Sequence, residues 1–139
     1  MSMAISPYIY LDGQCDEAIP FYEKVLQAKN LGIQTYGELP DSPEPMPEHL
    51  KNRVLHGALE MDGNKILFSD SMYGQPFTLG DQVTIAITTS ELDRLKGIYE
   101  GLADDGGKVL MELQSTFFSP LYGMVRDKYG ITWQLSGEA

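Results

Sequence analysis

The stretch "LYGMVRDKYGITWQL", Leu121 to Leu135, predicts two β-strands joined by a tight turn. Asp127 to Gly130 lies between the strands and has the composition of a turn. In the second strand, Ile131, Trp133 and Leu135 alternate with polar residues. Because successive strand residues point to opposite faces, we expect these three side chains to pack against a helix and their polar neighbours to face away from it.

The residues before this stretch predict a strand, a helix and another strand. The segments "DQVTIAITT" (81–89) and "KVLMELQST" (108–116) are strand-like. Between them, apolar residues at helical spacing predict a helix that Gly106 and Gly107 end. Ser90 followed by Asp93 resembles a capping box at the start of this helix.

The first half of the chain predicts the same order of elements. Strand-like segments occupy residues 6–13, 31–39, 53–61 and 65–72. A helix is expected to begin near Cys15 or Asp16, so that Pro20 falls in its first turn. Asp62-Gly63-Asn64 predicts a hairpin between the last two strands, and the proline-rich segment 40–52 predicts a loop.

The two halves also match in sequence. Tyr22-Glu23 in "FYEKVL" corresponds to Tyr99-Glu100 in "IYEGLA", an offset of 99 − 22 = 77 residues. The same offset superposes "TIAIT" on "PYIYL". The common spacing and the common order of elements predict an internal duplication.

Length, composition and charge restrict the class of protein. The chain has 139 residues, enough for one domain, with 42% hydrophobic and 22% charged residues. Its net charge of -10 disfavours nucleic acid and anionic membranes as partners. No apolar run approaches the roughly 20 residues that span a bilayer, and the N-terminus lacks the pattern of a signal peptide, so we expect a cytoplasmic protein. Cys15 is the only cysteine, which excludes an intramolecular disulfide.

Three segments resemble a known family. They are "YLDGQCDEAIPFYEKVLQA", "LHGALEMDGNKILFSD" and "GLADDGGKVLMELQSTFFSPLYGMVRDKYGITWQL". With them the chain is similar to the vicinal oxygen chelate superfamily, also called the glyoxalase/bleomycin resistance fold, and within it to the PhnB-like branch. The resemblance implies an α+β fold in which two βαβββ modules form a cupped, eight-stranded mixed sheet with helices outside. It also implies a single domain over residues 1–139, with modules at about 1–75 and about 80–139, and a homodimer.

Metal-binding members of the superfamily carry ligands on the first and last strands of each module. By the resemblance, these positions fall at Pro7, near Leu67 to Ser69, at Thr84 and at Gln134. Divalent transition metals prefer imidazole, thiolate or carboxylate ligands, and these positions supply none. We therefore expect no metal and no other cofactor.

His56 lies in the predicted strand 53–61, and its role is open at this point. Glu60 shares its face, but four residues at ~3.3 Å each separate the two by about 13 Å, too far to share one ion. The other histidine, His49, lies in the proline-rich segment. Two interpretations of His56 remain: a core histidine bonded to a neighbour, or a neutral imidazole that lines a ligand cleft.

Seven residues are candidates for binding a ligand in the cleft, and no catalytic residue is assigned. The candidates are His56, Glu60, Thr84, Gln114, Phe118, Tyr122 and Gln134. Strand alternation directs most of them to the cleft, and Phe118 lies in a loop at its rim. Cys15 is not expected to be a nucleophile, because no histidine lies near it in sequence.

Three functions remain open. The first is a metal-free, PhnB-like protein that binds a small organic molecule in the cleft of a homodimer. The alternative is a metal-dependent lyase or isomerase of the glyoxalase or dioxygenase type, which needs a cation to stabilise an enolate-like charge. The third is a dimeric adaptor without a small ligand. Some chains of this branch carry a ubiquinone-methyltransferase label, but the sequence lacks a glycine-rich turn for a nucleotide-like cofactor.

Overall fold

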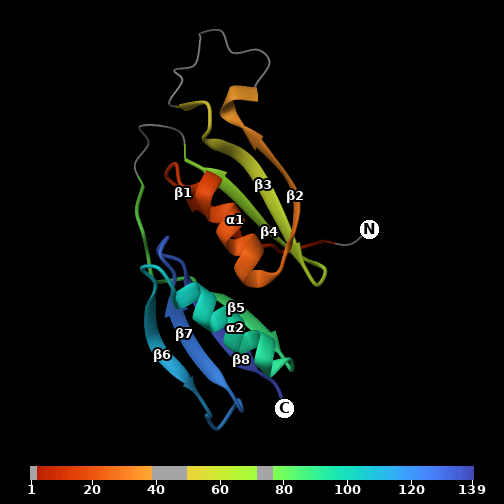
Figure 1. The fold of residues 1–139 in the computed structure, drawn as a ribbon, viewed down its shortest axis with the longest axis vertical. Coiled ribbons are helices and arrows are strands. Elements are labelled where there is room, and N and C mark those ends of the chain that lie inside the picture. The colour runs from red at the N-terminus through yellow and green to blue at the C-terminus, as the bar shows by residue number, and fades with distance from the viewer. Residues whose placement is uncertain (1–2, 39–49, 72–76) are drawn as a thin grey trace. The chain divides into compact units, whose positions relative to one another are not determined.

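The chain folds into two compact units, Met1–Phe77 and Thr78–Ala139, in a computed structural model that describes residues 3–38, 50–71 and 77–139. Each unit contains one α-helix and one four-stranded mixed sheet (Figure 1). The predicted α+β class and the predicted order of elements are therefore confirmed. Most of the proline-rich segment, including His49, lies outside the described residues.

The first unit contains four strands and one α-helix in the predicted order, with a short 3₁₀ helix between β2 and β3. The bounds are β1 (Tyr8–Leu11), α1 (Cys15–Leu26), β2 (Lys29–Thr35), η1 (Tyr36–Glu38), β3 (Val54–Met61) and β4 (Asn64–Asp70). The sheet has the order β1-β4-β3-β2, with β1 parallel to β4 and the other neighbours antiparallel. The predicted hairpin joins β3 to β4 through Asp62 and Gly63, whose φ angles of 50° and 86° suit the two-residue turns that match strand twist.

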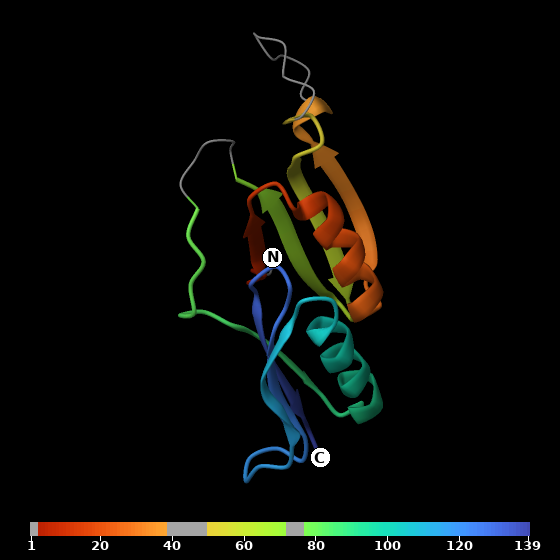
Figure 2. The ribbon, with the colours of Figure 1, turned by 60° about the vertical axis from the view of Figure 1, so that its left-hand side comes forward.

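The second unit repeats this topology. Its elements are β5 (Ile85–Thr89), α2 (Leu92–Ala103), β6 (Lys108–Gln114), β7 (Tyr122–Arg126) and β8 (Thr132–Gly137). The sheet has the order β5-β8-β7-β6, and again the first strand of the unit runs parallel to the last. Figure 2 shows each helix lying across one face of its own sheet. No helix in the described ranges is long and apolar enough to cross a bilayer.

The predicted start of the first helix is confirmed, but two expectations about the first turns of the helices are wrong. Helix α1 begins at Cys15, but Pro20 is its sixth residue and lies in the second turn, where its missing N–H leaves the Asp16 carbonyl without its usual partner. Helix α2 begins at Leu92 without a side-chain cap, so Ser90 does not form a capping box. In its place, the Thr89 hydroxyl accepts the backbone N–H of Glu91 at 3.0 Å.

Each core lies between the helix and the sheet of its unit. In the first unit, the largest fully buried side chains are Leu11, Ile19, Tyr22, Leu26, Val54, Leu59 and Phe68. In the second unit, they are Leu95, Leu102, Val125, Trp133 and Leu135. The expectation that Trp133 and Leu135 pack in the core is thus confirmed, and strand alternation then places Gln134 on the opposite face.

The matching core positions correct the predicted offset between the two halves. Leu95 follows Ile19 by 95 − 19 = 76 residues, and the same offset relates Leu102 to Leu26, with all four side chains completely buried. An offset of 77 would instead pair buried Tyr22 with half-buried Tyr99. The shared topology therefore supports the duplication. The buried positions give an offset of 76 residues between the halves, one fewer than the sequence words indicated.

A buried carboxylate organises the chain around α1. Asp70, at the end of β4, has no exposed surface. Its Oδ1 accepts the backbone N–H groups of Gly13 at 2.9 Å and Cys15 at 3.1 Å, and its Oδ2 accepts the N–H of Val54 at 2.8 Å. One side chain thus binds the turn before α1 and the start of β3 to the end of β4.

Asp127 has the corresponding role at the turn between β7 and β8. Its Oδ1 accepts the N–H groups of Tyr129 and Ile131, at 2.9 and 3.1 Å, and its Oδ2 accepts the indole N–H of Trp133 at 2.8 Å. The predicted turn at Asp127 to Gly130 is confirmed. Because the indole is held at its polar end, Asp127 also fixes how Trp133 sits in the core.

Replacing Asp70 by Asn should destabilise the protein by roughly 2–4 kcal/mol. The amide keeps one acceptor oxygen and puts an NH₂ group opposite a backbone N–H, so at least one buried donor loses its partner. Urea denaturation followed by circular dichroism measures the loss. Glu112→Gln, at an exposed strand position, is the matched control, and an equal effect of the two substitutions would contradict this role of Asp70.

Candidate functional site

The face of the second sheet opposite α2 carries a set of polar and aromatic side chains. Cα pairing in the sheet aligns Gln134 with Ala86 on β5 and Met124 on β7. The next row aligns Ser136 with Thr88 and Tyr122. Paired residues point to the same side of a sheet, so these two rows form one surface.

Gln134 is at the centre of this surface, and both ends of its amide are hydrogen-bonded. The hydroxyl of Tyr122 donates to its Oε1 at 2.6 Å. Its Nε2 donates to the hydroxyl oxygen of Thr84 at 2.9 Å. The amide therefore links the residue before β5 to the start of β7 across β8 and is fixed in orientation.

Aromatic rings continue from Tyr122 into the loop between β6 and β7. The ring of Phe118 packs edge-on against Tyr122 with centroids 5.0 Å apart, and Phe117 packs edge-on against Phe118 at 5.2 Å. Phe117 is fully exposed and Phe118 is 58% exposed. We call the series Phe117, Phe118, Tyr122, Gln134 and Thr84 the aromatic–amide row.

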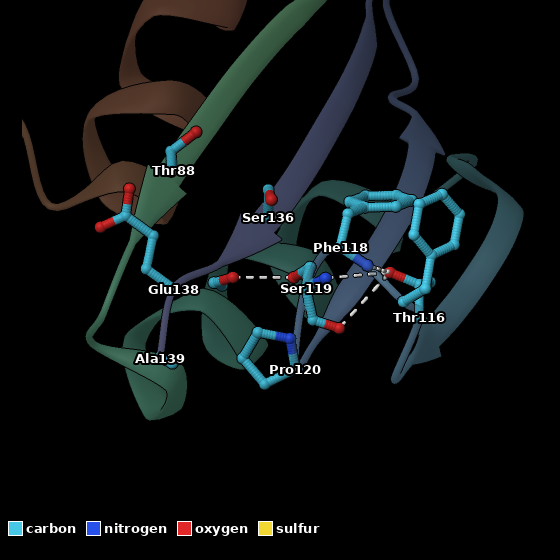
Figure 3. Close-up of a pocket in the computed structure, with 10 residues that line it drawn as sticks. Thr88, Thr116, Phe118, Ser119, Pro120, Ser136, Glu138 and Ala139 are labelled. Atoms are coloured by element: carbon cyan, nitrogen blue, oxygen red, sulfur yellow. Dashed lines mark hydrogen bonds between the residues drawn. The ribbon is translucent and has the colours of Figure 1, made fainter.

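A cavity of about 520 Å³ adjoins the aromatic–amide row at the ends of β5 and β8 (Figure 3). It is lined by Thr88, Thr116, Phe117, Phe118, Ser119, Pro120, Ser136, Gly137, Glu138 and Ala139. Ser119 is buried, and its hydroxyl donates to the carbonyl of Gly137 at 2.7 Å, which ties the aromatic loop to the end of β8. Pockets that hold small organic molecules measure roughly 300–1,000 Å³, so this cavity has the size of a ligand site.

The structure brings most of the candidate residues together. Thr84, Phe118, Tyr122 and Gln134 are consecutive members of one row. Gln114 pairs with Tyr122 through their Cα positions and shares its face, but its side chain turns back to donate to the Glu112 carbonyl at 3.0 Å.

The other two candidates, His56 and Glu60, lie on β3 of the first unit. His56 is exposed, and its ring centroid lies 6.3 Å from that of Tyr8. The interpretation of His56 as a core histidine is therefore wrong. Glu60 pairs in register with Lys29 on β2 and Lys65 on β4, a position that favours charge balance within the sheet over ligand binding.

Cys15 is a core residue. Its side chain is completely buried, and this burial, with the nearby Asp70 carboxylate as the next cause, raises the pKa of the thiol well above its usual range. The protonated thiol is a poor nucleophile. The expectation that Cys15 is not a catalytic nucleophile agrees with this environment.

The corrected offset changes which residues of this chain match the ligand positions of metal-binding relatives. With an offset of 76, Thr84 corresponds to Tyr8, where the sequence alone had indicated Pro7. The β1–β4 and β5–β8 pairings then make Ser69 the equivalent of Gln134. The donor set is thus two hydroxyl groups in the first unit, and one hydroxyl group and one amide in the second unit, where the amide oxygen already accepts the Tyr122 hydroxyl.

This donor set does not fit a divalent transition metal, which prefers imidazole, thiolate or carboxylate. In the described ranges, no group of three or more His, Cys, Asp or Glu side chains gathers in a way that suits a metal ion.

The element order and the topology of the two sheets match the glyoxalase/bleomycin resistance fold, and comparison with known proteins agrees. A glyoxalase/bleomycin resistance protein/dioxygenase domain from Frankia sp. EAN1pec superposes with a TM-score of 0.70 over 100% of this chain and 99% of that one, at 15% identity. The chain belongs to the PhnB-like family of this superfamily: the family model described as 3-demethylubiquinone-9 3-methyltransferase matches residues 3–136.

Individual relatives match along nearly the whole chain. Protein YjdN of Escherichia coli is 29% identical over 96% of this chain and 95% of its own length. The crystal structure of protein PA1353 from Pseudomonas aeruginosa has a TM-score of 0.86 at 28% identity, covering 99% of this chain and 98% of that one. A PhnB protein from Bacillus cereus has a TM-score of 0.79 at 26% identity, covering 98% and 100%.

Sequence reasoning missed Ser136 and Glu138, which line the cavity at the end of β8. They continue the alternation that starts at Thr132 and Gln134, so the period of two is the signal that could have identified them. No local pattern around Asp70 predicted its structural role, because its three backbone partners are distant in sequence.

The Cys15 thiol should resist alkylation in the folded protein. Iodoacetamide at pH 8 should modify it much more slowly in native than in urea-denatured protein, because burial disfavours the thiolate and blocks access. Mass spectrometry of timed aliquots follows the reaction. Equal rates in the two states would contradict the buried, protonated thiol.

Proposed function

We propose that the protein is a metal-free binding protein for a small organic molecule and that the aromatic–amide row is its recognition surface. The observation that carries the proposal is the engagement of Gln134 at both ends, by Tyr122 and by Thr84. A pre-oriented amide beside exposed rings provides hydrogen-bonding specificity together with apolar contact area. His56 and Tyr8, on the first unit, offer a second aromatic surface of the same kind.

Two enzymatic alternatives are less well supported. A lyase, isomerase or dioxygenase of the glyoxalase type relies on a cation to stabilise developing negative charge, and the donor set described above does not suit one. Methyl transfer, the activity in the family description, requires a site for a methyl donor. Each sheet here has one parallel strand pair only, unlike the doubly wound parallel sheets whose strand ends hold nucleotide-like cofactors.

We further propose a cytoplasmic homodimer. Strand β6 lies at an edge of its sheet and exposes Val109, Leu110 and Met111 to 39%, 40% and 38%. An edge strand with consecutive exposed apolar residues favours pairing with another surface. Light scattering should give a mass of twice 15.5 kDa. A mass of one chain would contradict the dimer.

A thermal-shift screen against aromatic compounds, hydrophobic antibiotics and small oxo-acids tests the binding function. A compound present at a hundredfold excess over its Kd should stabilise the protein by about 2.7 kcal/mol. Gln134→Leu and Tyr122→Phe should reduce this stabilisation, and Tyr122→Phe alone should change unliganded stability by only about 0.5–1.5 kcal/mol. Lys96→Gln, at an exposed position of α2, is the control that should bind like the unaltered protein.

Elemental analysis of protein purified without chelators tests whether the protein is metal-free. We expect less than stoichiometric zinc, nickel or iron. One equivalent of such a metal, lost on substitution of Gln134, would contradict the metal-free proposal. Failure of every compound to shift the melting temperature would contradict ligand binding and favour an adaptor role.

A further inference from the structure

We infer that the cavity at the end of β8 binds a small organic cation that carries an aromatic or apolar group. The inference rests on the proposed function and assigns the class of its ligand. It is carried by the juxtaposition, in one cavity of about 520 Å³, of two exposed phenyl rings and the carboxylate of Glu138.

The aromatic wall of the cavity comes from Phe117 and Phe118. Phe117 is fully exposed and Phe118 is 58% exposed, yet the loop that carries them is held in place. The Thr116 hydroxyl accepts the N–H groups of Phe118 at 3.3 Å and Ser119 at 3.1 Å. A fixed loop that leaves two large apolar side chains in solvent favours an apolar partner, and ring faces also attract cations.

The polar wall carries negative charge only. Glu138 is the one ionisable side chain among the residues that line the cavity, and it has no ion-pair partner in the described part of the chain. Its backbone N–H donates to the Thr89 carbonyl at 2.8 Å, which holds Glu138 at the end of β5. A net charge of -10 on the chain adds a long-range attraction for cations.

The floor between the two walls has hydroxyl groups that are available to a ligand. Thr88 and Ser136 are paired across β5 and β8, and their side chains make no hydrogen bond with other described residues. Figure 3 draws Ser136 between Glu138 and Phe118. A ligand ring placed against Phe118 would therefore direct an attached ammonium group over the hydroxyls towards the Glu138 carboxylate.

Three matched probes test the assignment: 2-phenylethylamine, which is cationic at pH 7, neutral 2-phenylethanol and anionic 3-phenylpropionate. Isothermal titration calorimetry should give the amine an affinity about tenfold higher than that of the alcohol and should detect no binding of the acid. Added salt should weaken binding of the amine and leave that of the alcohol unchanged.

Substitutions identify the groups responsible. Glu138→Gln should lower the affinity for the amine and leave that for the alcohol unchanged, whereas Phe118→Ala should weaken both. Glu100→Gln, an exposed carboxylate on α2, is the control and should bind like the unaltered protein.

Equal affinities for amine and alcohol, or an amine affinity that Glu138→Gln leaves unchanged, would overturn the assignment of a cation. The proposed function would survive that outcome if other organic compounds still stabilised the protein in a manner sensitive to Gln134→Leu. Loss of that stabilisation as well would overturn both.

Discussion

The alternation of side chains along β8 is the constraint on which the second unit depends. Trp133 and Leu135 are completely buried on the side of the sheet that faces α2. Because neighbouring strand residues point to opposite sides, burying these two leaves Gln134 and Ser136 on the other face. A slip of one residue would bury the amide and expose the indole, at a cost of several kcal/mol in lost apolar burial and unpaired polar groups.

Asp127 stabilises this register through hydrogen bonds. Its carboxylate binds two backbone N–H groups of the turn before β8 and the indole N–H of Trp133. One buried side chain thus fixes the turn and the position of the indole, and with them which residues of β8 face α2. In the first unit, Asp70 acts at the other end of the last strand, so the two buried carboxylates serve the same purpose at different points of a duplicated fold.

The sequence predicted what depends on local periodicity and turn chemistry. Alternation identified the buried face of "ITWQL", and Asp62-Gly63 identified the hairpin, because both signals lie within a few residues. The offset of the duplication was predicted one residue too high, since "YE" recurs by chance one position away from the true correspondence of the buried helix residues. The start of α2 was also misjudged, because Thr89, one residue before Ser90, provides the hydroxyl.

Long-range pairing was beyond the reach of the sequence. Thr84 and Gln134 are fifty residues apart, and nothing in their local context predicts that their side chains bond. The same holds for the ring of Phe118 against Tyr122, which depends on how the loop before β7 folds back. Strand alternation thus indicated that Thr84 and Gln134 share a face, while the bonds that link the side chains depend on the sheet register.

Both polar atoms of the Gln134 side chain are hydrogen-bonded within the second unit. An amide whose oxygen accepts a phenol hydroxyl and whose nitrogen donates to a hydroxyl oxygen is held in one orientation and keeps one lone pair and one N–H for an organic molecule. As an uncharged donor, its oxygen is a weak ligand for a divalent transition metal. The hydroxyl groups at the equivalent positions of the first unit, Tyr8 and Ser69, are likewise poor ligands for such a metal.

The most direct measurement is the nuclear magnetic resonance signal of the Gln134 side-chain amide in ¹⁵N-labelled protein, recorded as Mn²⁺ is added in the presence of excess Mg²⁺. The Mg²⁺ occupies weak sites on surface carboxylates, so selective line broadening reports a specific metal site. The account predicts that the Gln134 signal keeps its intensity relative to other side-chain amides. Selective loss of that signal at substoichiometric Mn²⁺ would contradict it.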